Sequence, residues 1–143
     1  MDKFKMDLQL FAGSFAHGTV LTLAAPAAGA LLNLTNISLG GWSADTIDVS
    51  DHNSTDAYRE FIQGMKDGGE ISVEANYVLA EAIKVQAAFD AGTVMAGCTM
   101  AFPGALGTLT IDLIATGIEL PSPFDDKLTA SYTFKVTGKP VLA

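Results

Sequence analysis

Histidine and cysteine, which bind many transition metals in proteins, are few in this chain. Both histidines, His17 and His52, lie in turn-like segments, and no carboxylates stand at a spacing that would complete a metal site with them. Asp45, Asp48 and Asp51 recur every third residue. On a strand this period does not place them on one face, and the pattern of a calcium-binding loop is missing. The sequence therefore predicts no metal site, and it assigns these side chains to turns and caps.

Candidate nucleophiles and acid–base pairs are equally isolated. Ser43 stands two residues after a glycine, as in a nucleophile elbow, but the second glycine of that motif is missing. Cys98, the only cysteine, shares a predicted strand face with apolar residues, which favours a buried, inert thiol. Asp125 and Asp126 follow a proline-rich turn without partner groups nearby. Glycine-rich phosphate or dinucleotide motifs are also missing. We expect no catalytic residue, no cofactor and no enzymatic activity.

Length and composition narrow the class of protein. The chain has 143 residues, enough for one domain, and its formal net charge of -8 argues against a protein that grips nucleic acid through phosphates. Apolar residues make up 49% and charged residues only 17%, which argues against disorder. This composition indicates either apolar surface buried between subunits or an unusually alanine-rich chain, and the 21 alanines account for part of it. The longest apolar run, residues 21–32, is too short to span a bilayer, and no export signal begins the chain. We expect no membrane insertion.

Hydrophobic periodicity predicts a mainly β domain over residues 14–143, preceded by an N-terminal arm over residues 1–13. The first two predicted strands form a long hairpin, and later ones alternate apolar and polar residues. Together they indicate a two-sheet β-sandwich or half-barrel flanked by one or two short helices. The predicted strands cover residues 19–24, 31–39, 45–50, 70–77, 93–102, 108–120 and 128–136.

Two segments have helical spacing. The first places Tyr58, Phe61, Ile62 and Met65 at i, i+3, i+4 and i+7, which predicts a helix whose apolar stripe packs on the core. The second is alanine-rich, covers residues 79–89 and ends before Gly92.

Two blocks of sequence resemble the major tail tube protein family of long-tailed, non-contractile bacteriophages. The first contains residues 37–39 (ISL), 44–50 (ADTIDVS) and 58–72 (YREFIQGMKDGGEIS), and the second contains residues 123–130 (PFDDKLTA) and 135–140 (KVTGKP). The opening residues 6–12 (MDLQLFA) resemble the start of structural proteins in phages of Gram-positive hosts. Gln63 stands where relatives often carry proline. The resemblance covers about residues 15–140.

The resemblance implies an assembly. Six copies would form a ring, each contributing about four strands to a shared inner β-barrel, and rings would stack into a hollow tail tube. The tube would enclose the tape-measure protein and conduct double-stranded DNA into the host without sequence-specific binding. Further partners would be the tail terminator and distal tail proteins. The protein would belong to the virion tail, assembled in the bacterial cytoplasm.

Two surfaces are candidates for roles in such a tube. An uncharged loop would contact the neighbouring ring, since it makes a poor solvated surface; its residues are Ala25, Pro26, Ala27, Ala28, Gly29 and Ala30. Polar strand faces would line the bore and give it a net negative charge, which repels phosphates. The candidates for the bore are Glu70, Ser72, Glu74, Asn76 and Asp112.

Two other functions stay open on the sequence. An Ig-like binding or decoration module would expose aromatic residues in loops, where only Trp42 and Phe124 are candidates. The tube protein of a related secretion or injection system would share nearly the same fold.

Overall fold

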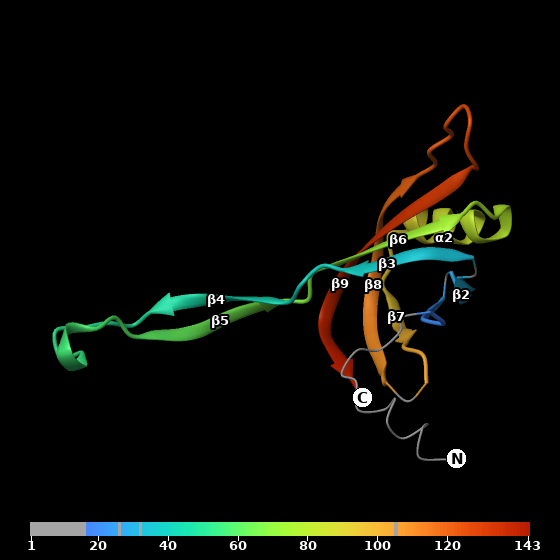
Figure 1. Ribbon diagram of the computed structural model, residues 1–143. Coiled ribbons are helices and arrows are strands. Elements are labelled where there is room, and N and C mark those ends of the chain that lie inside the picture. Colours follow the sequence, from blue (N-terminus) through green and yellow to red (C-terminus); the bar gives the residue numbers. More distant parts are fainter. Residues whose placement is uncertain (1–16, 26, 32, 105) are drawn as a thin grey trace, which may run out of the picture.

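The computed structural model describes residues 17–143 except 26, 32 and 105, so the predicted N-terminal arm lies outside the described residues. Nine strands, a short 3-10 turn and one helix are found in the described part of the chain (Figure 1). The elements are β1 (Val20–Leu23), β2 (Gly29–Leu31), β3 (Leu34–Leu39), β4 (Ser43–Asp48), η1 (Thr55–Ala57), β5 (Phe61–Asp67), β6 (Glu70–Asn76), α2 (Leu79–Ala91), β7 (Met95–Ala101), β8 (Thr108–Glu119) and β9 (Thr129–Leu142).

Seven strands form one antiparallel sheet in the order β2-β1-β7-β8-β9-β6-β3, which curls into a half-barrel (Figure 1). The half-barrel that the sequence predicts is confirmed. The second sheet is only the β4–β5 pair, which projects from the half-barrel instead of packing face to face on it. We call this pair with its connecting loop, residues 43–67, the projecting hairpin, and the rest the body.

The predicted long hairpin over residues 19–39 is wrong in its second half. β2 pairs with β1, but β3 pairs with β6 at the opposite end of the sheet. Asn33 lies between β2 and β3 with φ 59°, a left-handed conformation that asparagine tolerates better than most residues. The chain therefore leaves one end of the curled sheet and enters the other end within a few residues.

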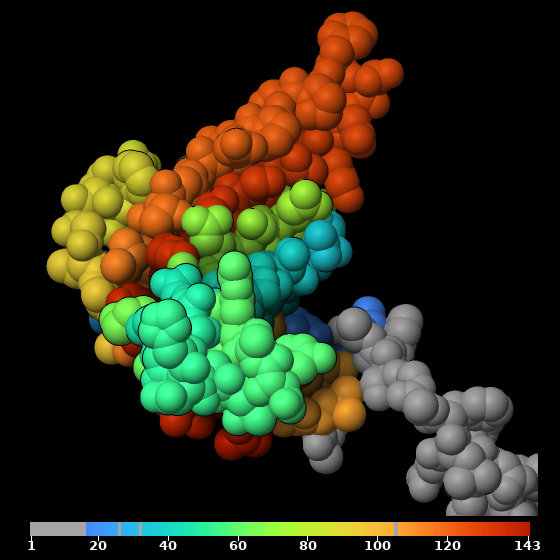
Figure 2. Space-filling view, turned by 90° about the vertical axis from the view of Figure 1, so that its left-hand side faces the viewer, coloured from blue at the N-terminus to red at the C-terminus, as the bar shows by residue number. Residues whose placement is uncertain are grey.

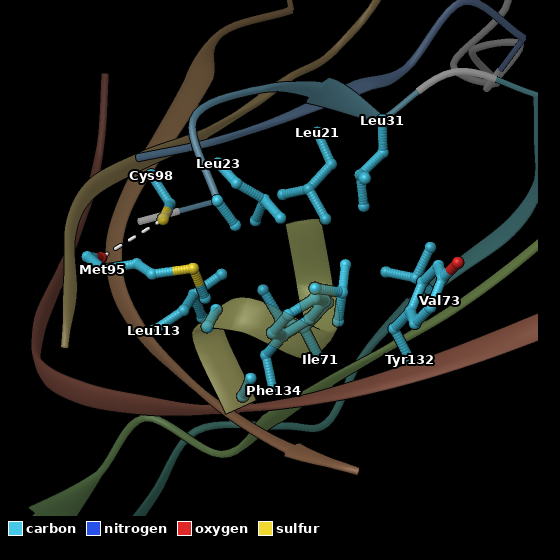
Figure 3. Close-up of a cluster of buried hydrophobic side chains, with 14 of the residues drawn as sticks. Leu21, Leu23, Leu31, Ile71, Val73, Met95, Cys98, Leu113, Tyr132 and Phe134 are labelled. Carbon is cyan, nitrogen blue, oxygen red and sulfur yellow. Dashed lines mark hydrogen bonds between the residues drawn. The ribbon is translucent and has the colours of Figure 1, made fainter. Parts of the chain in front are cut away.

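The core fills the concave side of the half-barrel. Alternation on β6, β8 and β9 points apolar side chains inward, as the sequence predicts, and Phe134 and Ile71 are fully buried. Figure 3 shows them in one cluster with Leu21 of β1 and Tyr132 of β9. The helix α2 adds Val85 and Ala88 to the same cluster. Gly92 ends α2 with φ 64°, so the predicted second helix and its stop are confirmed.

The predicted apolar face of β7 is only partly right. The register of β7 against β8 shifts between Met95 and Cys98. Gly97, which lies between these two residues, has φ 85°. This bulge changes which residues face inward. Met95 is therefore buried, while Val94, which the sequence places on the core face, is 45% exposed.

The predicted core helix stripe is wrong. Its residues lie in or next to β5, and all are exposed in the subunit: Tyr58 by 76%, Phe61 by 53%, Ile62 by 53% and Met65 by 82%. Gly64 explains part of the error, since glycine weakens a helix by about 1 kcal/mol. On the strand, a Cβ at this position would stand 3.4 Å from Asp45, so the two strands approach closely here.

Candidate functional site

The groups that could do covalent or metal chemistry stay apart in the structure. Within residues 17–143, apart from the three omitted positions, no cluster of three or more His, Cys, Asp or Glu side chains could hold a metal ion. Cys98 is fully buried, and burial raises the pKa of its thiol. Its Sγ accepts a hydrogen bond from Ala24 N at 3.4 Å and donates one to Met95 O at 3.2 Å (Figure 3). The predicted burial of this thiol is thus confirmed.

The projecting hairpin has exposed apolar surface on both of its faces, since Phe61 and Ile62 are neighbours on β5 and point to opposite sides. β4 and β5 pair with each other in a register that sets Ile47 opposite Ile62. Figure 2 views the molecule from the hairpin side, and the hairpin stands in front of the body. Apolar burial is the main driving force of association, so this surface points to a protein partner. Its large exposed apolar residues are Ile47, Val49, Tyr58, Phe61, Ile62 and Met65, joined by Trp42 just before β4.

The tip of the projecting hairpin, residues 48–60, is held by its own hydrogen bonds. Val49 N donates to Glu60 O at 2.9 Å, and Glu60 N donates to Ser50 Oγ at 2.7 Å. Ser54 Oγ donates to Glu60 Oε2 at 3.1 Å. Hydrogen bonds from the Ser50 hydroxyl and backbone lower the pKa of Asp48. The hairpin tip is therefore a defined structure, although it stands away from the core.

The base of the projecting hairpin is fixed to the body by two glycines and an ion pair. A Cβ at Gly69 would come 2.1 Å from Gly40 O, and Gly69 has φ 79°, so only glycine fits there without strain. A Cβ at Gly68 would come 2.6 Å from a methyl group of Val136. Lys135 Nζ lies 2.9 Å from Asp67 Oδ1. These contacts set the direction in which the hairpin leaves the half-barrel.

A groove of about 770 Å³ lies where the projecting hairpin meets the end of β9. Trp42, Met65 and Pro140 give it apolar walls, and Lys66 and Lys139 give it positive charge. We call it the hairpin-base groove. Trp42 is 54% exposed, so a large part of its ring is open to a partner.

A family model described as lambda phage tail tube protein matches residues 17–143. The chain belongs to this family. The resemblance seen in the sequence is therefore confirmed, and the protein is a tail tube protein, a structural component of a phage-like tail. Comparison with curated protein sequences gives no match.

Solved structures share the fold of this tail tube protein. The tail of an empty gene transfer agent particle, refined helically with C6 symmetry, superposes with a TM-score of 0.75 at 15% identity, covering 92% of this chain and 99% of the other. The virion of the native gene transfer agent superposes with a TM-score of 0.75 at 16% identity, covering 92% of this chain and 99% of the other. The sheath–tube complex of an extracellular contractile injection system in its extended state superposes with a TM-score of 0.73 at 11% identity, covering 96% of each chain.

Most of the predicted bore residues come together on one polar face. Glu70, Ser72 and Glu74 are exposed on β6, opposite Lys135, Thr133 and Ser131 of β9. Asn76 ends this row, half-buried, and its Oδ1 is buried without a hydrogen-bond partner among the described residues. Asp112 lies on the same face of the sheet, two strands from β6, on β8 opposite Thr137. Its Oδ1 accepts a hydrogen bond from Gly97 N at 3.0 Å and holds the β7 bulge. Whether this face lines a bore stays a prediction.

The predicted stacking loop is closer to the core than the sequence indicates. Pro26 lies outside the described residues, but Ala27 is 1% exposed and belongs to the core cluster. Gly29 and Ala30 form β2, and a Cβ at Gly29 would stand 3.1 Å from Lys84 Nζ on α2. Only Ala25, Ala28 and Ala30 are fully open. The stacking role stays a prediction, and deletion of the whole loop would also remove core contacts.

Sequence reasoning missed the projecting hairpin as a functional surface. Its apolar residues were assigned to a core helix, because i, i+3, i+4 and i+7 spacing also occurs by chance on a short strand with its flanking loop. One signal in the sequence could have found it. Gly64 and the pair Gly68-Gly69 are poor helix residues but suit a close strand pair and its sharp exit.

No helix in the described part of the tail tube protein has both the length and the apolar character needed to cross a bilayer.

Proposed function

We propose that six copies of this chain form a ring and that rings stack head to tail into a hollow tail tube. The observation that carries the proposal is the projecting hairpin, which exposes apolar side chains that the described part of the subunit does not cover. Family membership and the shared fold with a tail of C6 symmetry support the sixfold ring. The proposed role is structural and not catalytic.

Sheet topology supports a shared inner barrel of four strands per copy. β3 is an edge strand of the sheet and pairs with β6. At the other side, β7 pairs with β8 only from Thr108 to Leu113, while β9 continues beside β8 to Glu119. The layer β3-β6-β9-β8 therefore has two edges where backbone groups can pair with a neighbouring copy.

The size of such a barrel suits duplex DNA. Roughly 24 strands about 4.8 Å apart and tilted about 40° give a barrel radius near 24 Å and, after inward side chains, a bore of about 37–40 Å. A duplex about 20 Å wide fits within it. Glu70 and Glu74 would give the bore negative charge that repels phosphates. We propose that the tube encloses the tape-measure protein, conducts DNA, and meets tail terminator and distal tail proteins at its ends.

A tube of an injection system is the second candidate. The fold shared with the tube of a contractile injection system supports it, although 11% identity carries the likeness no further than the fold. The two candidates differ in cargo, and the Glu74→Lys variant separates them. In a tail that conducts DNA, this reversal in every copy should slow DNA ejection, most at low salt, where screening is weakest. Unchanged ejection at two salt concentrations, with tubes intact, would contradict a DNA-facing Glu74.

Electron microscopy of the purified full chain tests assembly itself. We expect rings or tubes with sixfold end views by negative stain, and a hexamer or larger species by light scattering. Monodisperse monomers at high protein concentration would contradict the proposal.

A further inference from the structure

We propose that the hairpin tip of one copy docks in the hairpin-base groove of the next copy along the tube. This inference rests on the proposed head-to-tail assembly and specifies which surfaces meet. Each copy has one tip and one groove, so the contact is heterologous and repeats without closing, as a growing tube requires.

The groove has the shape and chemistry of a receptor for an amphipathic tip. Trp42 and Met65 form its exposed apolar wall, and Met65 is 82% exposed. Lys66 and Lys139 line the same groove. Large aromatic and methionine side chains are enriched at protein interfaces, while charged residues such as lysine belong to the polar rim around the interface centre.

The tip has a matching apolar anchor. Tyr58 is 76% exposed, and the hydrogen bonds around Ser50, Ser54 and Glu60 fix the backbone that carries it. Asp56 and Ala57, just before it, have φ of 55° and 62°, a strained conformation for residues with a side chain. Strain of this kind concentrates at ligand contacts, and a tip already held in one shape loses less entropy when it docks.

The charge of its lining residues distinguishes this groove from another apolar hollow, which lies between α2 and β8. The tip carries four carboxylates and one guanidinium, a formal charge of -3; they belong to Asp48, Asp51, Asp56, Glu60 and Arg59. Among the residues that line the groove, Lys66 and Lys139 are basic and Asp67 is acidic, which gives a formal charge of +1.

The competing hollow lies between α2 and the far end of β8. Leu79, Ile83 and Phe89 line it, but its one charged lining residue is Asp90. An acidic tip is repelled there and attracted at the hairpin base. Opposite potentials favour correct docking and suppress the wrong contact.

The length of the hairpin makes the contact intermolecular and sets the spacing between copies. The run from Ser43 to Thr55 reaches at most about 40 Å at roughly 3.3 Å per residue. The paired strands keep the tip away from its own base, so the tip must find the base of another copy (Figure 1). Docking from tip to base then predicts an axial repeat of about 40 Å or slightly less, since the hairpin need not run parallel to the tube axis.

Crosslinking in assembled tubes tests the contact. The full chain carrying Asp56→Cys and Lys139→Cys is assembled and treated with a short bismaleimide, then analysed by denaturing electrophoresis. Native Cys98 is fully buried and does not react. We expect a ladder of dimers, trimers and longer chains. The matched control pairs Asp56→Cys with Gln86→Cys, an exposed residue of α2 that lines the competing hollow, and we expect at least tenfold less ladder.

The outcomes separate this inference from the proposed function. A ladder in the control pair, or none in either pair while tubes form, would overturn the docking and leave tube assembly standing. Wild-type protein that forms neither rings nor tubes would overturn both. A second measurement uses charge: Asp56→Lys should reduce tube yield at least tenfold with an unchanged melting temperature, and adding Lys139→Asp should restore most of it. Full assembly by Asp56→Lys alone would also contradict the docking.

Discussion

In the body, Leu21, Ile71 and Phe134 are completely buried, whereas Tyr58 and Met65 in and beside the projecting hairpin are 76% and 82% exposed. Both regions are built from antiparallel strands. The body buries its apolar side chains within one chain. Among the described residues, no further layer covers the projecting hairpin, and we propose that another chain covers its apolar residues.

The two regions also differ in how they are held. Packing around a shared core fixes the body, while ladder bonds, the hydrogen-bonded tip and the glycine-lined base fix the hairpin. Substitutions in the body should therefore change the stability of the subunit. Substitutions on the hairpin should change assembly and leave stability nearly intact, except where they alter its base.

Phe134→Ala should have the largest effect on the subunit. Removal of a fully buried aromatic ring from the core costs about 3–5 kcal/mol of unfolding free energy. Urea denaturation followed by circular dichroism measures it. The matched control is Phe124→Ala, whose ring is fully exposed and should change stability by under about 0.5 kcal/mol. Equal losses for both would remove the distinction between buried and exposed apolar residues.

Gly69→Ala should come next, because it disturbs the joint between the two regions. The new Cβ meets Gly40 O, and the left-handed backbone disfavours alanine, for a cost of about 2–3 kcal/mol. Gly41→Ala is the control, since a Cβ there meets nothing within 4 Å. Thermal melts compare the two. A Gly69→Ala variant as stable as the control would mean that the base is not tightly held.

The body was largely predictable from the sequence. Alternation in β6, β8 and β9 predicts their inward residues because a strand on one side of a core has a period of two. The β7 bulge was not predictable from alternation, because Gly97 adds a residue and reverses the phase. The separation of β2 from β3 also escaped prediction, since it depends on which distant strand each one pairs with.

The hairpin was predictable only in part. Its family motif is visible in the sequence, but local spacing favours a helix for Tyr58, Phe61 and Met65, and the true partner of β5 is β4 across a loop. The hairpin-base groove was missed entirely, because Trp42, Lys66 and Lys139 are distant in sequence and meet only when the hairpin joins β9.

Phe61→Ala tests whether the projecting hairpin serves assembly and not the stability of the subunit. A core helix would have made this change cost several kcal/mol, but a side chain that is 53% exposed on a strand should cost under about 1 kcal/mol. We expect tube yield to fall strongly while the subunit remains folded. Phe61→Leu should retain tube formation, because it keeps an apolar contact. Electron microscopy gives the yield and denaturation gives the stability; a large stability loss with normal tubes would reverse the interpretation.

Asp67→Asn should have the smallest effect on the stability of the subunit, and this effect should disappear at acidic pH. The Gly69 N–H and the Lys135 ammonium lower the pKa of Asp67 below 3.8. A carboxyl with a lower pKa in the folded state stabilises the fold above the unfolded pKa, and this stabilisation is lost as the pH falls through the folded value. The wild type should be slightly more stable than the variant at neutral pH, and equal to it in acid. Urea titrations at several pH values measure the difference in stability between the wild type and the variant. A difference that does not change with pH would contradict the stabilising role of the Asp67 carboxylate.

Methionine oxidation tests most directly whether the hairpin is covered by another chain. Met65 is 82% exposed in the subunit, while Met95 and Met100 are buried and serve as internal controls. Subunits and assembled tubes are exposed to dilute peroxide, and sulfoxide at each methionine is followed by mass spectrometry. We predict rapid oxidation of Met65 in subunits, at least tenfold slower oxidation in tubes, and slow oxidation of both controls throughout. Met65 that oxidises equally fast in tubes and in subunits would contradict the central claim that assembly buries the projecting hairpin.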